Sequence, residues 1–412
     1  MKGKNIIVGQ SGGPTAVINA SLAGIFSKAK ELGADKIYGM LNGIQGFLEG
    51  RYVDISRSIK DENDVNLLKH TPAAFLGSCR FKLPSPEGNE AIYESIFALL
   101  EKLDIHAFFY IGGNDSMDSI SKLSEYAKRI SSDVLFIGVP KTVDNDLVHT
   151  DHSPGFGSAA KYIATSMKEL IRDNKVNDQD VVTIVEIMGR DAGWLTGSSI
   201  LSKCDDCSGP DLIYLPEVPF EVDSFLSDIR ETQKTNRAVI VAVSEGIKTA
   251  DGKYVCDTVS AARSVDSFGH TQLTGTARAL ADLVAEVIGC KVRAIEFSSL
   301  QRCAGHIISL TDLEEAFLVG SEAVKAAAEG YNAKFIQLNR ISDIPYICET
   351  AICDVALVAN LKKDVPLDWI NEKKNYVTKE FINYVKPLIM GEVNIQYENG
   401  IPKHIPDVIK EI

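Results

Sequence analysis

The chain has 412 residues, of which 45% are hydrophobic and 24% charged, and its formal net charge is −13. This length predicts two domains with the composition of a globular protein. The acidic balance without any basic run argues against a nucleic-acid partner, and no apolar run approaches the length of a membrane span. Eight scattered cysteines suit reduced thiols, so we expect the protein in the cytoplasm.

The first predicted unit is a strand, a glycine-rich loop and a helix. Asn5 to Gly9 is a short apolar strand, and the loop from Gln10 to Thr15 follows it. Gly12 and Gly13 in this loop would let backbone N–H groups approach a phosphate at the helix N-terminus. A later Gly-Ser turn carries Arg80, which could equally be a surface charge or bind phosphate.

Two loops of one kind follow the predicted strands His106 to Ile111 and Val134 to Val139. The segment between the first loop and the second strand has helical spacing, so the unit is strand, loop, helix, strand, loop. In a parallel sheet both loops reach the carboxyl edge, where open α/β sheets bind ligands. The loops supply Asn114, Asp115, Ser116, Lys141, Thr142, Asp144 and Asp146.

Three more predicted strands deliver small and charged residues in the second half of the chain. These residues are Met188, Gly189, Arg190, Glu245, Arg293, Ser299 and Arg302. We expect residues 42–53 to be a connection, 248–274 a polar excursion, and the last eighty residues short strands with one helix at 378–385. The alternation of strand and helix predicts an α/β protein with two doubly wound, Rossmann-like αβα domains.

The strand-end residues together suit phosphoryl transfer to a hydroxyl group. Asp144 and Asp146 are two residues apart, so one carboxylate can accept a proton while the other helps to hold Mg²⁺. Lys141 and Arg190 can neutralise charge on the transferring group. Glu245 can accept hydrogen bonds from sugar hydroxyls.

Two further arginines, Arg293 and Arg302, are suited to anchor the phosphate of a phosphorylated polyol. Taken singly, most of these residues also have a structural explanation. The two aspartates could form a turn, Glu245 could cap a helix, and Arg190 could pair with Glu186. Their joint occurrence at successive strand ends favours a site.

Four strings stand at these strand ends: Ser11 to Asn19, Gly112 to Ser116, Pro140 to Asp146 and Met188 to Arg190. In this order and spacing they resemble the signatures of the phosphofructokinase family, and the resemblance extends to about residue 330. The tail from Phe381 to Ile389 is similar to the bacterial pyrophosphate-using branch. The resemblance implies a phosphoryl-donor domain of residues 1–150 plus about 303–375. It implies a sugar-phosphate domain of 151–302 plus about 376–412.

The resemblance also implies a reaction. Asp144 would be the general base on the 1-hydroxyl of fructose 6-phosphate, flanked by Thr142 and Asp146, with Lys141 and Arg190 stabilising the transferring group. Pyrophosphate would bind to Gly12, Gly13, Arg80, Asp115 and Ser116. The sugar phosphate would bind to Thr142, Asp144, Met188, Gly189, Arg190, Glu245, Arg293, Ser299 and Arg302. Family members form dimers and tetramers, so we expect a homodimer or homotetramer.

Two residues favour pyrophosphate over ATP as the donor. ATP-dependent members usually carry glycine at the positions of Asp115 and Lys141. A carboxylate at 115 would intrude where the α-phosphate of a nucleotide should lie, and a lysine at 141 supplies charge for a smaller donor. Pyrophosphate and ATP differ greatly in reaction energy, so a pyrophosphate donor would also imply a readily reversible reaction.

Three positions depart from the family pattern. Asn114 stands where the family usually has a metal-binding aspartate, and its carbonyl can still coordinate Mg²⁺ with less charge. Ser299 and Val181 replace residues that normally help to bind the 6-phosphate, so we expect a rebuilt phosphate pocket and consider sedoheptulose 7-phosphate as an additional acceptor. The alternatives are an ATP-dependent 6-phosphofructokinase and a non-catalytic regulatory homologue that binds sugar phosphate.

Overall fold

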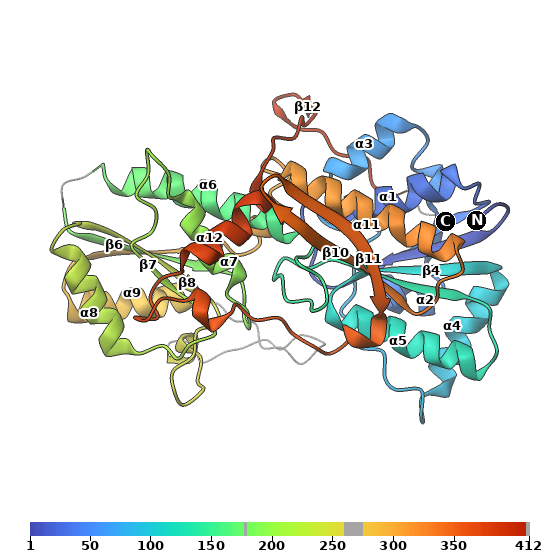
Figure 1. The fold of residues 1–412 in the computed structure, drawn as a ribbon, viewed down its shortest axis with the longest axis horizontal. Helices are drawn as coiled ribbons and strands as arrows, with labels where there is room; N and C mark the ends of the chain where they lie inside the picture. The colour runs from blue at the N-terminus through green and yellow to red at the C-terminus, as the bar shows by residue number, and fades with distance from the viewer. Residues whose placement is uncertain (177–178, 259–274, 409–412) are drawn as a thin grey trace.

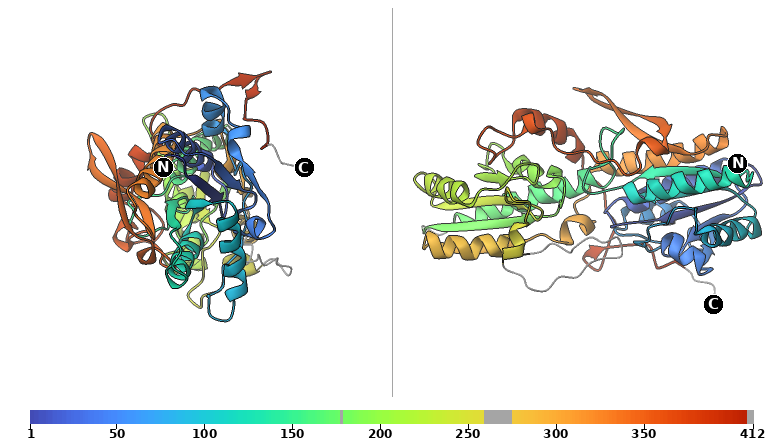
Figure 2. Two further views of the ribbon diagram at one scale, coloured as in Figure 1. Left: turned by 90° about the vertical axis from the view of Figure 1, so that its right-hand side faces the viewer. Right: turned by 90° about the horizontal axis from the view of Figure 1, so that it is seen from below.

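Two sheets, each covered by helices on both faces, lie side by side in the computed structural model of the chain (Figure 1). The structure describes residues 1–176, 179–258 and 275–408. This arrangement confirms the predicted α/β class. Figure 2 shows the two domains end to end along the long axis of the molecule. Within the described ranges, no helix has both the length and the apolar character needed to cross a membrane.

The first sheet has seven strands in the order β11-β10-β5-β4-β1-β2-β3. Its strands are β1 (Asn5–Gln10), β2 (Ile37–Met40), β3 (Tyr52–Asp54), β4 (Ile105–Gly112), β5 (Leu135–Pro140), β10 (Lys334–Asp343) and β11 (Tyr346–Asp354). The inner pairs are parallel, and the two edge strands β3 and β11 are antiparallel to their neighbours. The helices of this domain are α1 (Ile18–Glu31), α2 (Gly43–Leu48), α3 (Glu62–His70), α4 (Glu90–Lys102), α5 (Asn114–Arg129) and α11 (Leu310–Ala328).

Alternation along the buried strands produces two cores in this domain. Ile6 and Val8 of β1 pack into the core beneath α1, α3 and α11, whereas Ile7 packs into the core beneath α4 and α5. Successive strand side chains point to opposite faces, so a fully apolar strand must be covered on both sides. The strand ends are consequently the places where polar side chains can gather.

The second sheet has four parallel strands in the order β7-β8-β6-β9. They are β6 (Val181–Ile187), β7 (Leu212–Tyr214), β8 (Ala238–Ser244) and β9 (Lys291–Glu296). The helices associated with this domain are α6 (Phe156–Asn174), α7 (Trp194–Gly197), α8 (Val222–Gln233), α9 (Thr276–Val287), α10 (Leu300–Cys303) and α12 (Lys379–Val385). Val185 and Val182 again face two separate cores.

Two local expectations differ from the structure, and a third is largely untested. The expected connection at 42–53 contains the helix α2 and the strand β3. In place of the short strands expected near the C-terminus, β10 and β11 form a hairpin of 10 and 9 residues. Its tip is apolar but exposed, with Ile344 94% exposed, so apolar pattern and burial do not coincide there. The expected excursion at 248–274 lies largely outside the described residues.

The C-terminal tail belongs to both domains. Phe381 of α12 is fully buried in the core of the second sheet. Beyond α12 and the small hairpin of β12 (Tyr397–Glu398) and β13 (Ile401–Pro402), the chain returns to the first domain. There Ile405 and Val408 join the core around α1 and α3. The expected assignment of all of 376–412 to the sugar-phosphate domain therefore does not extend to these last residues.

Candidate active site

The loop after β1 is hydrogen-bonded to a second loop, which contains Ser78 and Cys79. The Ser78 hydroxyl donates a hydrogen bond of 2.6 Å to the Gly12 carbonyl, and the Gly12 N–H donates to the Cys79 carbonyl at 3.1 Å. Gly12 has φ +76, a conformation that favours glycine. A methyl group on Gly12 would lie only 3.2 Å from the Lys141 Nζ atom. The predicted phosphate loop thus presents its backbone beside Lys141.

Lys141 connects this loop to the carboxylates after β5. It is 3% exposed, and its Nζ donates a hydrogen bond of 2.7 Å to the Gly13 carbonyl. Burial lowers the pKa of Lys141 to about 8, although the charges of Asp144 and Asp146 oppose that shift. Lys141 is therefore a buried cation whose charge is poorly solvated and available to a phosphate ligand.

The two aspartates of the same loop are half-buried and lie close enough for their charges to interact. Burial, followed by the charge of Asp146, raises the pKa of Asp144 to about 7. Burial also raises the pKa of Asp146, although a hydrogen bond from Thr142 opposes the shift. The Thr142 hydroxyl accepts a hydrogen bond of 3.1 Å from the Asp144 N–H, which fixes the start of the turn. A carboxylate with a pKa near neutrality is suited to act as a general base.

The loop after β4 adds an amide to this group. The Nδ2 of Asn114 donates to the Oδ2 of Asp146 at 3.4 Å. The Oδ1 of Asn114 is buried and has no hydrogen-bond partner among the described residues. A buried acceptor next to a carboxylate fits a hard cation such as Mg²⁺. Asp115 and Ser116 follow in the first turn of α5, half-buried and buried respectively.

The second sheet supplies the opposite side of the site. The Gly189 N–H, at φ +129, donates a hydrogen bond of 3.3 Å to the Oε1 of Glu245. Burial and the nearby charge of Asp144 raise the pKa of Glu245 to about 8, and the positive charge of Arg190 opposes this. Glu245 is consequently close enough to Asp144 for their charges to interact.

Met188 and Arg190 complete this side. The Met188 N–H donates to the Oε1 of Gln301 at 3.3 Å. The Nε of Arg190 and the Nε2 of Gln301 are buried donors without a hydrogen-bond partner in the described part of the chain. Two buried donors without partners favour a ligand that is rich in acceptor oxygens. Gln301 was not among the predicted site residues.

Arg302 lies nearer to the glycine loop than expected. A methyl group on Gly13 would come within 3.2 Å of the Nη1 atom of Arg302. The positive charges of Arg302 and Arg80 also contribute to lowering the pKa of Lys141. Arg302, predicted to bind the sugar phosphate, thus comes from the second domain to the predicted pyrophosphate loop.

Two predicted substrate residues are placed apart from this group. Ser299 is exposed just before α10. Arg293 pairs with Thr183 in the interior of the β6–β9 ladder, and its guanidinium forms an ion pair of 3.2 Å with Asp173 at the end of α6. Because this position is remote from the carboxyl edge of the sheet, we leave Arg293 out of the site of this chain.

A pocket of about 360 Å³ adjoins Arg190. Lys248 and Lys362 are among its lining residues, but Lys362 forms a 2.6 Å ion pair with Asp364. Positive and negative side chains alternate around this pocket. Charge alone therefore does not assign a ligand to it.

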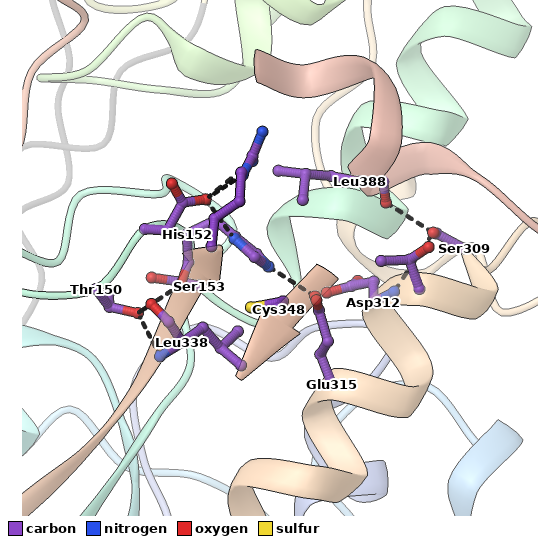
Figure 3. Close-up of polar contacts among 12 residues, drawn as sticks. Thr150, His152, Ser153, Ser309, Asp312, Glu315, Leu338, Cys348 and Leu388 are labelled. Atoms are coloured by element: carbon purple, nitrogen blue, oxygen red, sulfur yellow. Dashed lines mark hydrogen bonds and ion pairs between the residues drawn. The ribbon is translucent and has the colours of Figure 1, made fainter. Parts of the chain in front are cut away.

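A second buried polar cluster is centred on His152, which follows the loop of Lys141 to Asp146 (the catalytic loop) in sequence (Figure 3). His152 is hydrogen-bonded through Nδ1 to Asp151 at 2.8 Å and through Nε2 to Glu315 at 2.6 Å. Cys348 is the third possible metal ligand of this group. Burial would lower the pKa of His152, but Glu315 and Asp151 raise it to about 9. Both ring nitrogens thus have carboxylate partners, as a protonated imidazole requires.

Comparison with known proteins identifies the family of the chain. A family model described as "Phosphofructokinase" matches residues 5–296. Proteins named pyrophosphate–fructose 6-phosphate 1-phosphotransferase are similar: one from Halomonas elongata is 38% identical over 97% of this chain and 95% of its own length. Another, from Xanthomonas campestris, is 40% identical over 98% of this chain and 96% of its own length. The crystal structure of a pyrophosphate-dependent phosphofructokinase from Nitrosospira multiformis covers 99% of this chain and 98% of its own, with 35% identity and a TM-score of 0.89.

Proposed function

Since the chain belongs to the phosphofructokinase family, we propose that it transfers a phosphoryl group from pyrophosphate to the 1-hydroxyl of fructose 6-phosphate. The products would be fructose 1,6-bisphosphate and phosphate, and the reaction would run in both directions. The observation that carries this proposal is the position of the buried Lys141, which donates to the Gly13 carbonyl and interacts with the charges of the half-buried Asp144 and Asp146. A cation there bridges the phosphate loop and the base.

In this mechanism Asp144 accepts the proton of the sugar 1-hydroxyl. Its raised pKa makes it basic enough to do so near neutral pH, because a buried carboxylate gains by taking up the proton. Lys141 and Arg190 then stabilise the charge that the transferring group spreads over its oxygens. Thr142 holds the turn of the catalytic loop through its bond to the Asp144 N–H.

The remaining residues would bind the two substrates. Gly12, Gly13, Arg80, Asp115 and Ser116 would bind pyrophosphate, joined by Arg302 because it lies beside Gly13. Met188, Gly189 and Glu245 would face the sugar phosphate, and the exposed Ser299 is left out of this set together with Arg293. The unpartnered donors of Arg190 and Gln301 support an anionic ligand between the two sheets.

Mg²⁺ would be held by Asn114 and Asp146. The unpartnered Oδ1 of Asn114 supports this assignment, because it is an oxygen ligand in the immediate neighbourhood of a carboxylate. When bound, the ion would neutralise part of the negative charge of pyrophosphate.

The donor is tested with Asp115→Gly. We expect the wild type to form fructose 1,6-bisphosphate with Mg²⁺ and pyrophosphate, and ATP use to emerge in the variant, because the carboxylate that excludes the α-phosphate is removed. The control is Asp133→Gly, the same exchange at an exposed position in the connection between α5 and β5. Wild-type turnover with ATP alone would contradict the donor assignment, and turnover with neither donor would favour a binding-only homologue.

We also propose that the protein acts as a homodimer or homotetramer in the cytoplasm. All eight cysteines are free, which is the expected state in a reducing compartment. Light scattering coupled to gel filtration measures the assembly. A monomer at the concentration of the activity assay would contradict it.

A further inference from the structure

The catalytic loop contains one buried residue that touches neither substrate in the proposed mechanism. Asn145 stands between Asp144 and Asp146, is fully buried, and has φ +55. Its Oδ1 accepts a hydrogen bond of 3.0 Å from the Ser153 N–H. Its Nδ2 donates to the hydroxyl of Tyr384 at 2.9 Å. The side chain of Asn145 therefore fixes the turn from which both catalytic carboxylates extend.

Tyr384 reaches this turn from a distant part of the chain. It lies on α12, whose neighbouring residue Phe381 is buried in the core of the second sheet. The ring of Tyr384 lies 5.1 Å from that of Trp194 and 5.4 Å from that of Trp369, measured between centroids. The guanidinium of Arg340 also lies over the ring of Tyr384, at 4.6 Å from its centroid. These contacts hold the ring independently of its hydroxyl.

The hydroxyl of Tyr384 uses its single proton and an acceptor lone pair. It donates a hydrogen bond of 2.5 Å to the Asp151 carbonyl and accepts the bond from Asn145. Asp151 follows the catalytic loop in sequence, and its carbonyl also accepts from the Nζ of Lys363 at 2.6 Å. One oxygen atom of the C-terminal helix thus joins two points of the connection between β5 and α6.

We propose that Tyr384 is a positioning residue of phosphoryl transfer: its hydroxyl, held by the second domain, fixes Asn145 and with it the carboxylates of Asp144 and Asp146. This proposal rests on the proposed role of Asp144 as the base. It gives the C-terminal helix a part in the reaction that its sequence did not indicate. The residue touches no substrate and acts only through Asn145.

The test compares Tyr384→Phe with Tyr376→Phe. Phenylalanine keeps the ring and removes only the hydroxyl, and the hydroxyl of Tyr376 bonds to the Pro210 carbonyl at 3.3 Å, away from the catalytic loop. We expect kcat with pyrophosphate to fall about 10- to 100-fold in Tyr384→Phe, because displacement of a catalytic group by about 1 Å can cost that much. Both KM values should change less than about twofold, and Tyr376→Phe should keep wild-type kcat.

A double-mutant cycle with Asn145→Gly tests the route. Glycine tolerates the positive φ of Asn145 while removing its amide. If Tyr384 acts through Asn145, the second substitution adds little to the loss caused by the first. Additive losses, or a Tyr384→Phe kcat within about twofold of the wild type, would overturn the proposal.

Hydrogen–deuterium exchange gives a result that does not depend on turnover. The peptide covering residues 141–153 should exchange faster in Tyr384→Phe than in the wild type and in Tyr376→Phe. Unchanged exchange in this peptide would overturn the positioning role even if the wild type were inactive with pyrophosphate. Inactivity of the wild type with faster exchange in the variant would count against the proposed function alone.

Discussion

The chain contains two clusters of buried and half-buried charged side chains, and the pKa shifts of their members have opposite directions. The transfer cluster consists of Lys141, Asp144, Asp146 and Glu245. Burial raises the pKa of Asp144 and Glu245 and lowers that of Lys141, so each group is held with its charged form disfavoured. The support cluster consists of Asp151, His152, Glu315 and Arg340. There, ion pairing outweighs burial and lowers the pKa of Asp151 and Glu315 while it raises that of His152.

Both clusters contain side chains that are buried or half-buried, so burial does not explain the opposite pKa shifts. The number of hydrogen-bond and ion-pair partners does. In the support cluster, each ring nitrogen of His152 has a carboxylate, and the hydroxyl of Tyr346 adds a bond of 2.5 Å to Glu315. In the transfer cluster two carboxylates share one loop, and its neighbours Asn114 and Arg190 keep atoms without a hydrogen-bond partner among the described residues. Substrates and a metal ion would supply the missing charges. A site that binds charged ligands is therefore expected to be under-paired before they arrive.

The largest expected effect is on turnover, in Asp144→Asn. The variant loses its proton acceptor, so kcat should fall about 10³- to 10⁴-fold. Its stability should not fall. Because its pKa is raised in the folded state, Asp144 contributes to stability below its unfolded pKa, and this contribution is lost as pH rises through about 7. Above pH 7 the neutral amide of the variant therefore removes an unfavourable charge from the folded state.

Urea denaturation at pH 8, together with pyrophosphate-dependent turnover, measures both expectations for Asp144→Asn. A variant that unfolds at lower urea than the wild type, or one that keeps more than about a tenth of kcat, would contradict the assignment of Asp144 to the transfer cluster.

Glu315→Gln should have the reverse effect, with a loss of stability and little change in kcat. Removing one partner of a buried ion pair leaves the other uncompensated, which costs about 3 kcal/mol of unfolding free energy. Glu314→Gln is the matched control, because the neighbouring Glu314 is exposed on the same helix. Chemical denaturation at pH 6 measures the difference. Equal stability of the two variants would show that the support cluster does not stabilise the fold.

The two clusters also differ in how far the sequence could predict them. Lys141, Asp144 and Asp146 belong to one loop at the end of an apolar strand, so local pattern and parallel-sheet topology place them together. The bond from His152 to Glu315 joins residues 163 positions apart, and that from Asn145 to Tyr384 spans 239. No local periodicity records such contacts. They depend on how α11 and α12 pack against the rest of the chain.

Domain packing explains the other departures. The position of Arg302 after β9 predicts that it lies at a sheet edge, but only the arrangement of the two domains brings it to Gly13. Arg293 belongs to an edge strand, and its ion pair with Asp173 follows from the end of α6 lying beside it. Ile405 and Val408 are two apolar residues in a polar tail, too few for a periodic signal, yet they return to the first core.

The smallest expected effect is the pH dependence of kcat/KM, which distinguishes the titration of the proton acceptor Asp144 from that of the cation Lys141. Asp144 must be deprotonated to accept the hydroxyl proton, so activity should rise as pH increases through about 7. Lys141 must stay protonated to stabilise the phosphoryl group, so activity should fall as pH increases through about 8. The profile of the wild type is therefore expected to be a narrow bell.

Lys141→Arg tests the assignment of the alkaline limb. Arginine remains charged throughout this range, so the variant should lose the decline near pH 8 while retaining the rise near pH 7. Its maximal rate should be lower because the guanidinium is larger than the ammonium group and the site is buried. An alkaline limb that persists unchanged in Lys141→Arg would assign it to another group, such as Glu245, whose pKa is raised to about 8 by burial and by the charge of Asp144.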